Sequence, residues 1–298
     1  MIFASGIYQM DSVTIPAGET WEAAGRVIIT RSDNKPPSVS ISNGATVRGI
    51  WCGGTRETTG GASVNIAQDA VFDNCALFGY YGGFVIGDTT NGHRAQIVNS
   101  MFVNCGGGDY AHPIYLADWT GQPGDGMTID NNLFLGCEGY SIHLWNDNYG
   151  GTHYHTVTRN FIGAAHKGIV SKGHDNLINH NVIWSTNSTH SYLSIGAGLK
   201  WTWNLYGAQV GQLLNQSDAD AVIRNNGFIT PTPTFGKSPQ VYDNVRGLLG
   251  YSQASITNSV TALVASFSQT PQALLIDATI DAHTDKLRDV LAHWSVAV

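Results

Sequence analysis

Charged side chains are scarce in this sequence of 298 residues. Only 12% of the residues are Asp, Glu, Lys or Arg, and the formal net charge is −7 at pH 7. The negative charge and the absence of any basic run argue against a nucleic-acid partner and against adsorption to an acidic membrane surface. Uncharged polar residues are abundant instead, which suits stacked strands, because like charges would otherwise lie one above another.

Long apolar runs and the common catalytic motifs are also missing. No run of 18 or more apolar residues occurs, so no transmembrane helix is expected. Residues 1–8 have no basic start and only a short apolar run, which does not fit a signal peptide. We expect either a mature chain or a protein made in the cytoplasm that leaves by another route, as virion proteins do. No CxxC pair, Gly-rich phosphate loop or nucleophile elbow is present.

A short repeated pattern runs through the middle of the chain. It consists of an apolar residue, two variable residues, an anchor residue and two more apolar residues, and it is clearest at Asn132, Asn160 and Asn181. The same pattern recurs with these further anchors: Cys75, Ser100, Asn204, Asn226 and Asn244. Successive anchors lie 18 to 32 residues apart. A period of this size indicates a repeat architecture.

The residues that flank the anchors form two apolar columns. Three positions before each anchor stand Phe72, Ile97, Ile129, Val157, Ile178, Trp201, Ile223 and Val241. Two positions after it stand Leu77, Phe102, Phe134, Ile162, Ile183, Tyr206 and Phe228. We interpret these columns as the interior of a coil whose short strands pair in parallel with the coils above and below, about 4.8 Å away. An Asn at the turn tolerates left-handed backbone, and its amide can bond to the next Asn in a ladder.

These lines resemble the parallel β-helix repeat of the right-handed pectate-lyase-like superfamily, which includes polysaccharide lyases, glycosidases and many phage tailspikes. The resemblance covers roughly residues 30 to 250. It implies an all-β fold, a single-stranded right-handed parallel β-helix, and it is specific for fold rather than for function.

The sequence divides into three parts. We expect an N-terminal cap over 1–30, the β-helix over 31–250 and a C-terminal segment over 251–298. Thr270 and Pro271 are suited to begin a helix. Apolar residues then recur at helical spacing at positions 276, 280, 287, 291 and 294. The spacing predicts an amphipathic helix over roughly 272–293 that either caps the last coil or mediates contact with a partner or within a trimer.

The four cysteines are Cys52, Cys75, Cys105 and Cys137. They lie 23, 30 and 32 residues apart, which matches the coil period better than a metal motif. We interpret them as small core residues. A Cys105–Cys137 disulfide between neighbouring coils is the alternative that the geometry allows.

Strand alternation predicts an outward-facing group of polar and aromatic residues. When the three strands that follow the anchor turns are aligned, alternation points two rows of side chains outward. One row is Tyr115, His143 and Val170, and the other is Ala117, Trp145 and Lys172. The neighbouring loops carry Asp118, Trp119 and Asp147. Aromatic rings with polar neighbours are what a sugar binds, so we expect glycan contact at Tyr115, Trp119, Trp145, Asp118 and Asp147. The alternative is that these are ordinary exterior side chains.

Two catalytic hypotheses use the same region. The segment around Lys172 is similar to the lysine-bearing coil of alginate-lyase-type β-helices, which implies Lys172 as a base, with His143 beside it and Ca²⁺ as the cofactor of such a lyase. In that pattern an Arg on the next coil assists the Lys, but the next coil here, residues 190–196, holds no Arg. No carboxylate cluster for Ca²⁺ is evident either.

A glycosidase instead needs two carboxyls about 5 to 9.5 Å apart. The nearest carboxyls are Asp118, Asp125, Asp130 and Asp147. A metal site at His153 and His155, with His143 or His174, is a further alternative.

Three classes of function remain open at this point. The first is a virion-associated structural β-helix, tailspike-like or capsid-decorating, that is homotrimeric and contacts host glycans or capsid and tail proteins. The second is a polysaccharide-degrading lyase or glycosidase. The third is a secreted glycan-binding module without catalysis. The expected location is accordingly the virion or the extracellular space. Apart from Ca²⁺ in the lyase hypothesis and the histidine alternative above, no cofactor or metal is expected.

Overall fold

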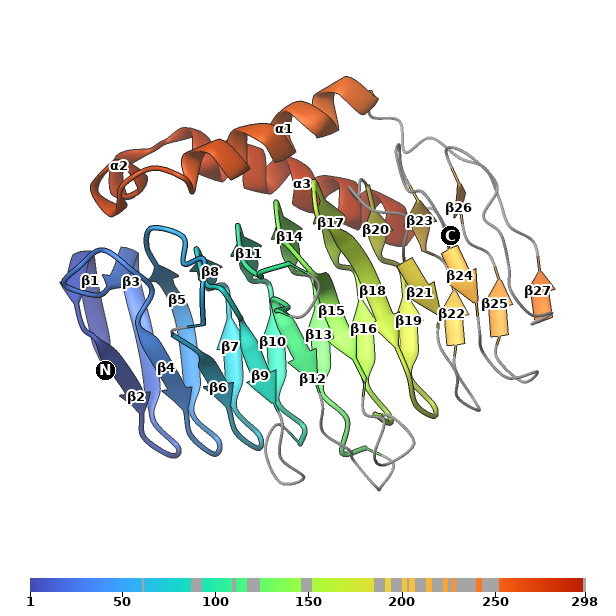
Figure 1. Cartoon of the computed structure of the whole chain (residues 1–298), viewed down its shortest axis with the longest axis horizontal. Helices are drawn as coiled ribbons and strands as arrows, with labels where there is room; N and C mark the ends of the chain where they lie inside the picture. The colour runs from blue at the N-terminus through green and yellow to red at the C-terminus, as the bar shows by residue number, and fades with distance from the viewer. Residues whose placement is uncertain are drawn as a thin grey trace.

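The computed structural model of this chain is a parallel β-solenoid with a layer of helices along one side (Figure 1). It describes residues 1–60, 62–86, 93–108, 111–116, 124–145, 152–184, 191–193, 200–202, 204–206, 213–215, 222–224, 227–228, 240–242 and 252–296. The parallel pairing of its strands confirms the expected β coil.

Each coil contributes strands to three columns. Column 1 is a nine-stranded sheet of β2 (Ser12–Ile15), β4 (Ser38–Ile41), β6 (Val64–Ile66), β9 (Phe84–Ile86), β12 (Ile114–Leu116), β15 (Tyr140–Leu144), β18 (Lys167–Ser171), β21 (Ser191–Leu193) and β24 (Leu213–Asn215). Column 2 holds β7 (Val71–Asp73), β10 (Gln96–Val98), β13 (Thr128–Asp130), β16 (Thr156–Thr158), β19 (Leu177–Asn179), β22 (Lys200–Thr202), β25 (Val222–Arg224) and β27 (Gln240–Tyr242).

Column 3 lies beyond the anchor turn. It holds β8 (Ala76–Phe78), β11 (Met101–Val103), β14 (Leu133–Leu135), β17 (Phe161–Gly163), β20 (Val182–Ile183), β23 (Leu205–Tyr206) and β26 (Gly227–Phe228). In the first coils, columns 2 and 3 are joined in the long strands β1 (Ile2–Gln9), β3 (Thr20–Thr30) and β5 (Thr46–Gly53). Residues 1–30, expected as a cap, thus pair in parallel like the later coils, β1 with β3 and β2 with β4.

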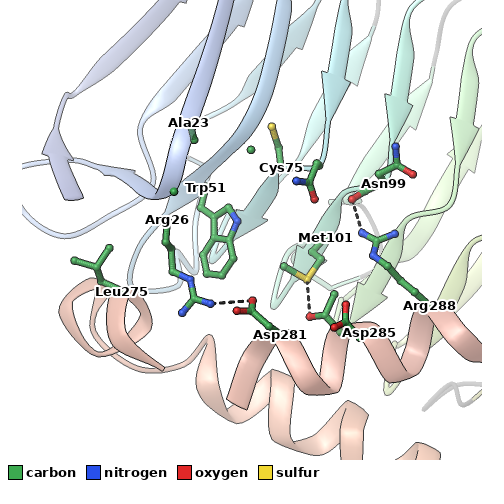
Figure 2. Close-up of a pocket in the computed structure, with 14 residues that line it drawn as sticks. Ala23, Arg26, Trp51, Cys75, Asn99, Met101, Leu275, Asp281, Asp285 and Arg288 are labelled. Carbon is green, nitrogen blue, oxygen red and sulfur yellow. Dashed lines mark hydrogen bonds and ion pairs between the residues drawn. The ribbon is translucent and has the colours of Figure 1, made fainter. Parts of the chain in front are cut away.

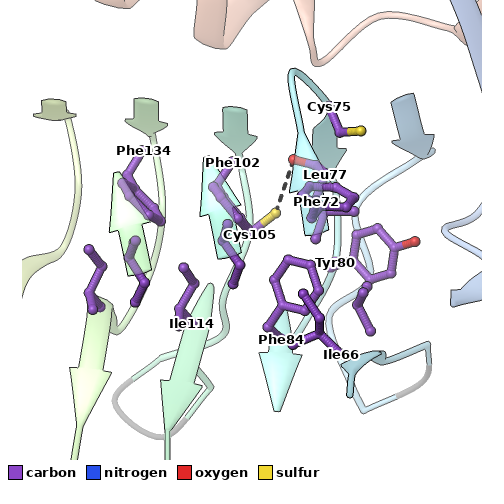
Figure 3. Close-up of a cluster of buried hydrophobic side chains, with 14 of the residues drawn as sticks. Ile66, Phe72, Cys75, Leu77, Tyr80, Phe84, Phe102, Cys105, Ile114 and Phe134 are labelled. Carbon is purple, nitrogen blue, oxygen red and sulfur yellow. Dashed lines mark hydrogen bonds between the residues drawn. The ribbon is translucent and has the colours of Figure 1, made fainter. Parts of the chain in front are cut away.

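The predicted register is confirmed residue by residue. Ile97 pairs with Phe72 on one side and with Ile129 on the other, and Phe102 likewise lies between Leu77 and Phe134. The inward rings stack on one another, with the centroids of Phe102 and Phe134 only 4.7 Å apart (Figure 3). Three-residue strands suffice because only the middle residue of each strand in columns 2 and 3 points into the core.

The anchor residues form a buried ladder. The Asn132 side-chain oxygen accepts the Ser100 N–H at 2.8 Å, and Asn160 in turn accepts the Asn132 N–H at 3.0 Å. The ladder continues through Asn181 to Asn204. Asn226 and Asn244 lie outside the described residues. Every buried amide in the described ladder thus finds its partner one coil away.

One detail of the turn prediction is wrong. Where the structure describes both residues, the left-handed backbone is adopted by the residue before the anchor, not by the anchor itself. Asn99, Asn131, Arg159 and His180 have φ between 52° and 55°. The preceding residue makes the bend and points outward, which leaves the anchor amide free to turn inward. Arg and His at this position indicate that the turn tolerates residues other than Asn.

All four cysteines are buried and free. Cys105 and Cys137 follow column 3 in successive coils, and the Cys137 thiol donates to the Phe102 carbonyl at 3.3 Å. The alternative of a disulfide between them is therefore wrong. Burial raises the pKa of Cys105 to about 12, so its thiol stays protonated and unreactive.

Among the described residues, three helices follow the solenoid, where one was predicted. They are α1 (Gln253–Ser266), α2 (Pro271–Ile276) and α3 (Thr279–Val296). Thr270 and Pro271 do begin a helix, with the Thr270 hydroxyl accepting the Ala273 N–H at 3.4 Å. That helix ends at Ile276, whose side chain is 81% exposed, and the chain restarts as α3. None of the described helices is long and apolar enough to cross a membrane.

The helices pack along the side of the coil rather than over its last turn, which corrects the capping prediction (Figure 1). They bury the outer face of column 3 and of the long strands before it. The buried outer residues are Ile28, Trp51, Ala76, Phe78, Met101, Val103, Leu133, Leu135, Phe161, Val182 and Trp184. Column 3 is therefore apolar on both faces, which explains its continuous apolar triplets.

Polar contacts tie the helical layer to several coils (Figure 2). Arg26 donates to the carbonyls of Leu274 and Asp277, at 2.9 and 2.7 Å, and pairs with Asp281 at 2.9 Å. Arg288 donates to the Asn131 carbonyl at 2.8 Å and also to the Asn99 carbonyl. A cavity of about 580 Å³ remains between these two arginines.

Candidate functional site

The outer face of column 1 brings the predicted residues together. Tyr115 on β12 pairs in register with His143 on β15, and His143 pairs with Val170 on β18. The ring centroids of Tyr115 and His143 lie 5.0 Å apart, and both side chains are half-buried. Val170 is only 2% exposed and so contributes packing rather than an accessible surface.

The second predicted row continues the parallel pairing just beyond the strands. The backbone N–H of Trp145 donates to the Leu116 carbonyl at 3.0 Å, and the backbone N–H of Lys172 donates to the Leu144 carbonyl at 2.7 Å. The Lys172 ammonium lies 4.7 Å from the Trp145 ring centroid, and the rings of Trp145 and His143 are 6.1 Å apart. A cation over an indole face is worth about 0.5–1 kcal/mol at an exposed site, so the two side chains orient each other.

Three further residues complete the group. The His112 ring meets His143 edge-on at 4.2 Å, and the Tyr140 ring lies 5.2 Å from His143. The Lys167 ammonium lies 5.0 Å from the Tyr140 centroid. The sequence held a signal for this second Lys–aromatic pair, because Tyr140 and Lys167 stand one residue before the aligned segments and pair in the same register. We call the whole group the aromatic patch: His112, Tyr115, Tyr140, His143, Trp145, Lys167 and Lys172.

Backbone contacts fix the geometry of the patch. The Tyr140 N–H donates to Nδ1 of His112 at 2.9 Å, so a neutral His112 carries its proton on Nε2. Because this bond joins two successive coils, the His112 ring is held between them. The patch therefore stands on paired strands and bonded turns, which is the rigid support that a precise binding surface needs.

Several predicted residues lie either outside the described part of the chain or on another part of the coil. Asp118, Trp119 and Asp147, together with Ala117, lie outside the described residues. Asp125 pairs with Arg94 at 3.1 Å, and Asp130 pairs with Arg159 and accepts the Thr158 hydroxyl at 2.7 Å. These two carboxylates belong to column 2 and to the turn before it, and their arginines already neutralise them. Neither supplies a glycosidase acid to the aromatic patch.

The histidines of the predicted metal site, His153, His155 and His174, serve the coil itself. Nδ1 of His155 accepts the Met127 N–H at 3.0 Å, and the His155 N–H donates to the Asn176 side chain at 2.9 Å. The rings of His153 and His174 stack at 4.9 Å. Burial, with smaller effects from neighbouring histidines, lowers the pKa of His155 to about 3. Across the described part of the chain, no group of three or more His, Cys, Asp or Glu side chains is arranged to hold a metal ion.

Comparisons with protein-family models, with curated proteins and with solved structures find no match to this chain.

Proposed function

We propose that this protein is a glycan-binding β-solenoid and that the aromatic patch is its carbohydrate-binding surface. The observation that carries the proposal is the row of rings on the outer face of column 1, in which Tyr115, His143 and Trp145 follow one another with Lys172 at the end. The faces of sugar rings are apolar and their rims carry hydroxyls. A surface of half-buried rings with N–H and O–H groups at its edges complements both.

The shape of the patch favours a chain of sugars over a small isolated ligand. Its two Lys–aromatic pairs, Lys167–Tyr140 and Lys172–Trp145, stand five residues apart along neighbouring strands. The rings of Tyr140 and Trp145 lie 5.2 and 6.1 Å from the His143 ring between them, so the aromatic rings form one continuous row. The surface is also rigid before binding, so little conformational entropy is lost when an extended chain settles on it.

The biological setting of this activity is part of the proposal. The repeat resembles that of the pectate-lyase-like superfamily, and within it we favour a virion-associated protein, tailspike-like or capsid-decorating, that contacts host-surface glycans as a homotrimer. Capsid or tail proteins are the other partners expected there. A secreted, extracellular binding module would use the same surface. Degradation of the glycan is the alternative, with Lys172 as base and His143 beside it.

The test is a binding screen against acidic and neutral polysaccharides with the wild type, Trp145→Ala and His143→Ala. Gln96→Ala is the matched control, because it removes an exposed side chain from the outer face of column 2. We expect Trp145→Ala to weaken binding about tenfold or more, since one ring contact is worth about 1.4 kcal/mol. Equal binding by all four proteins would mean that the aromatic patch is not the carbohydrate-binding surface.

Reducing-sugar and unsaturated-uronate assays on the same samples separate binding from cleavage. Cleavage that disappears in Lys172→Ala or His143→Ala would make the protein a polysaccharide-degrading enzyme. Binding without cleavage supports the proposal as stated. The size of the protein in solution then tests the homotrimer.

A further inference from the structure

A hollow of about 440 Å³ lies where column 3 turns into column 1. It is lined by segments that follow β5, β8, β11 and β14, and so by four successive coils. The lining residues are Arg56, Glu57, Thr58, Tyr81, Gly107, Gly108 and Glu138. The volume falls within the range of about 300–1,000 Å³ typical of small-ligand sites.

Charged groups of both signs line this hollow. Arg56 pairs with Glu138 at 2.5 Å and donates to the Gly106 carbonyl at 3.2 Å. Glu138 also accepts the Gly108 N–H at 2.9 Å. Glu57, 8% exposed, accepts the Ala62 N–H at 3.1 Å and lies 3.7 Å from Arg31.

Each of these carboxylates thus has an arginine beside it, and the hollow has little net charge. An arginine next to a carboxylate offers donors and acceptors side by side, which matches two adjacent hydroxyl groups. A neutral, hydroxyl-rich ligand fits this chemistry better than an ion.

Glycines give the hollow an aromatic wall. A Cβ at Gly107 would lie 2.1 Å from the Tyr81 ring, and a Cβ at Gly106 would lie 2.1 Å from the Glu138 carbonyl oxygen. Gly106 also has a φ of 95°, which side chains rarely allow. Because these two positions are glycines, the Tyr81 ring and the backbone of Glu138 can pack closely against the loop that contains Gly106 and Gly107. Tyr81 remains half-buried, with part of its side chain accessible.

The hollow adjoins the aromatic patch. Glu138 lines the hollow and Tyr140 belongs to the patch, with Gly139 between them. A Cβ at Gly139 would lie 2.6 Å from Nδ1 of His112 and 2.5 Å from the Ala111 carbonyl oxygen. One backbone segment therefore forms a shared wall between the hollow and the patch.

We propose that this hollow is a second carbohydrate subsite, which takes a single sugar residue with adjacent free hydroxyls through the Arg56–Glu138 pair and the Tyr81 ring. The inference rests on the proposed function, because the subsite would read one residue of the glycan that lies along the aromatic patch. The patch supplies contact area to the chain, whereas the hollow selects the hydroxyl pattern of that one residue.

The test compares Glu138→Gln and Arg56→Met with Trp145→Ala. Asp69→Asn is the matched control, since it breaks an exposed Arg94–Asp69 pair of 2.7 Å at a different corner. We expect Glu138→Gln and Arg56→Met each to weaken binding of the best glycan from the screen about tenfold or more, because hydrogen bonds to charged groups are lost. Asp69→Asn should leave binding unchanged.

A second measurement detects sugar binding in the hollow directly. Free monosaccharides (glucose, galactose, mannose and N-acetylglucosamine) are titrated while the backbone amide signals of Gly107 and Gly108 are followed by NMR. We expect at least one sugar to shift these signals in the wild type and in Trp145→Ala, but not in Glu138→Gln. Unchanged thermal unfolding of each variant confirms that it is folded.

The outcomes separate the two proposals. Loss of glycan binding in Trp145→Ala alone, with normal binding in both hollow variants, overturns the subsite and keeps the proposed function. A second outcome is that monosaccharides shift the Gly107 and Gly108 signals while the patch variants still bind the glycan normally. That result would support the subsite and contradict the aromatic patch as the binding surface. If no monosaccharide shifts these amides, the subsite is wrong.

Discussion

Columns 1 and 3 are built on the same coil, yet their outer faces differ. On column 3, outward residues such as Leu133 and Leu135 are completely buried beneath the helices. On column 1, the outward residues Tyr115, His143 and Trp145 remain half-buried. The inward residues of both columns are alike, because the coil alone determines them. The outward residues show where each face lies: one is an internal surface of the fold, and the other is partly open to solvent.

A charge placed under the helical layer tests whether the outer face of column 3 belongs to the core. Leu287→Asp on α3 replaces a fully buried side chain that packs in the cluster over column 3. We expect it to lower the free energy of unfolding by about 4 kcal/mol or more, since a buried leucine is lost and a carboxylate is left without a partner. Urea denaturation measures the effect.

Ala282→Asp is the control for this change, because it puts the same side chain on the exposed face of the same helix. It should change the stability by less than about 0.5 kcal/mol. Equal losses in both variants would mean that the helical layer is not an integral part of the core.

Removing one rung of the Asn ladder tests what both columns share. Asn160 accepts from the main chain and side chain of Asn132 and donates to the Ile129 carbonyl at 2.9 Å. Asn160→Ala leaves these groups buried without partners, so we expect a loss of roughly 3 kcal/mol in urea denaturation. Thr156→Ala, on the outer face of column 2, should cost far less. A ladder variant as stable as this control would contradict the structural role of the anchors.

Acid should weaken the coil through His155. Its pKa is about 3 when folded, against 6.5 for an ordinary histidine, so between these values the unfolded chain binds the additional proton. Stability is therefore intact above pH 6.5 and falls as the pH drops toward 3. From pH 7 to pH 5 the expected loss is on the order of 2 kcal/mol.

His155→Asn is the comparison for this prediction, because Asn176 already occupies the equivalent position one coil on. Measured by urea denaturation at several pH values, this variant should lose less stability on acidification. Parallel pH profiles for the two proteins would rule out His155 as the source.

The smallest effect is expected at the aromatic patch. Lys172→Ala removes a cation from the Trp145 ring and should cost no more than about 1 kcal/mol of stability. Thermal unfolding compared with the wild type measures it. A larger loss would make the patch a structural element like the outer face of column 3.

The repeat made most of the fold predictable, because each strand's partner lies one period away. The positions of Phe102, Asn132 and Lys172 all follow from that register. The helical layer was harder to predict. Apolar outer residues such as Phe78 and Leu135 were its signal, but α1 has only a weak apolar stripe. The break after Ile276 divides what the spacing predicted as one helix, because Asp277 accepts from the Thr279 N–H and hydroxyl and ends the pattern there.

The candidate site was predictable to the same extent as the strands beneath it. Tyr115, His143, Trp145 and Lys172 came together because pairing places them. The hollow beside them was not predicted, since Arg56 and Glu138 lie 82 positions apart in the sequence and meet through turns rather than strands. A repeat period gives the register of strands but not the path of the turns between them.

The helical layer changes how the coil should unfold. A repeat in which each coil contacts only its neighbours can open from either end, one coil at a time. Here α2 lies against β1 and β3, Arg288 of α3 reaches the turn at Asn131, and the Trp184 indole donates to Thr257 of α1 at 3.2 Å. The helices therefore connect the coils that contain β1 and β3 to the coil that contains β20. We therefore expect the coils from β1 to β20 to unfold together rather than one at a time.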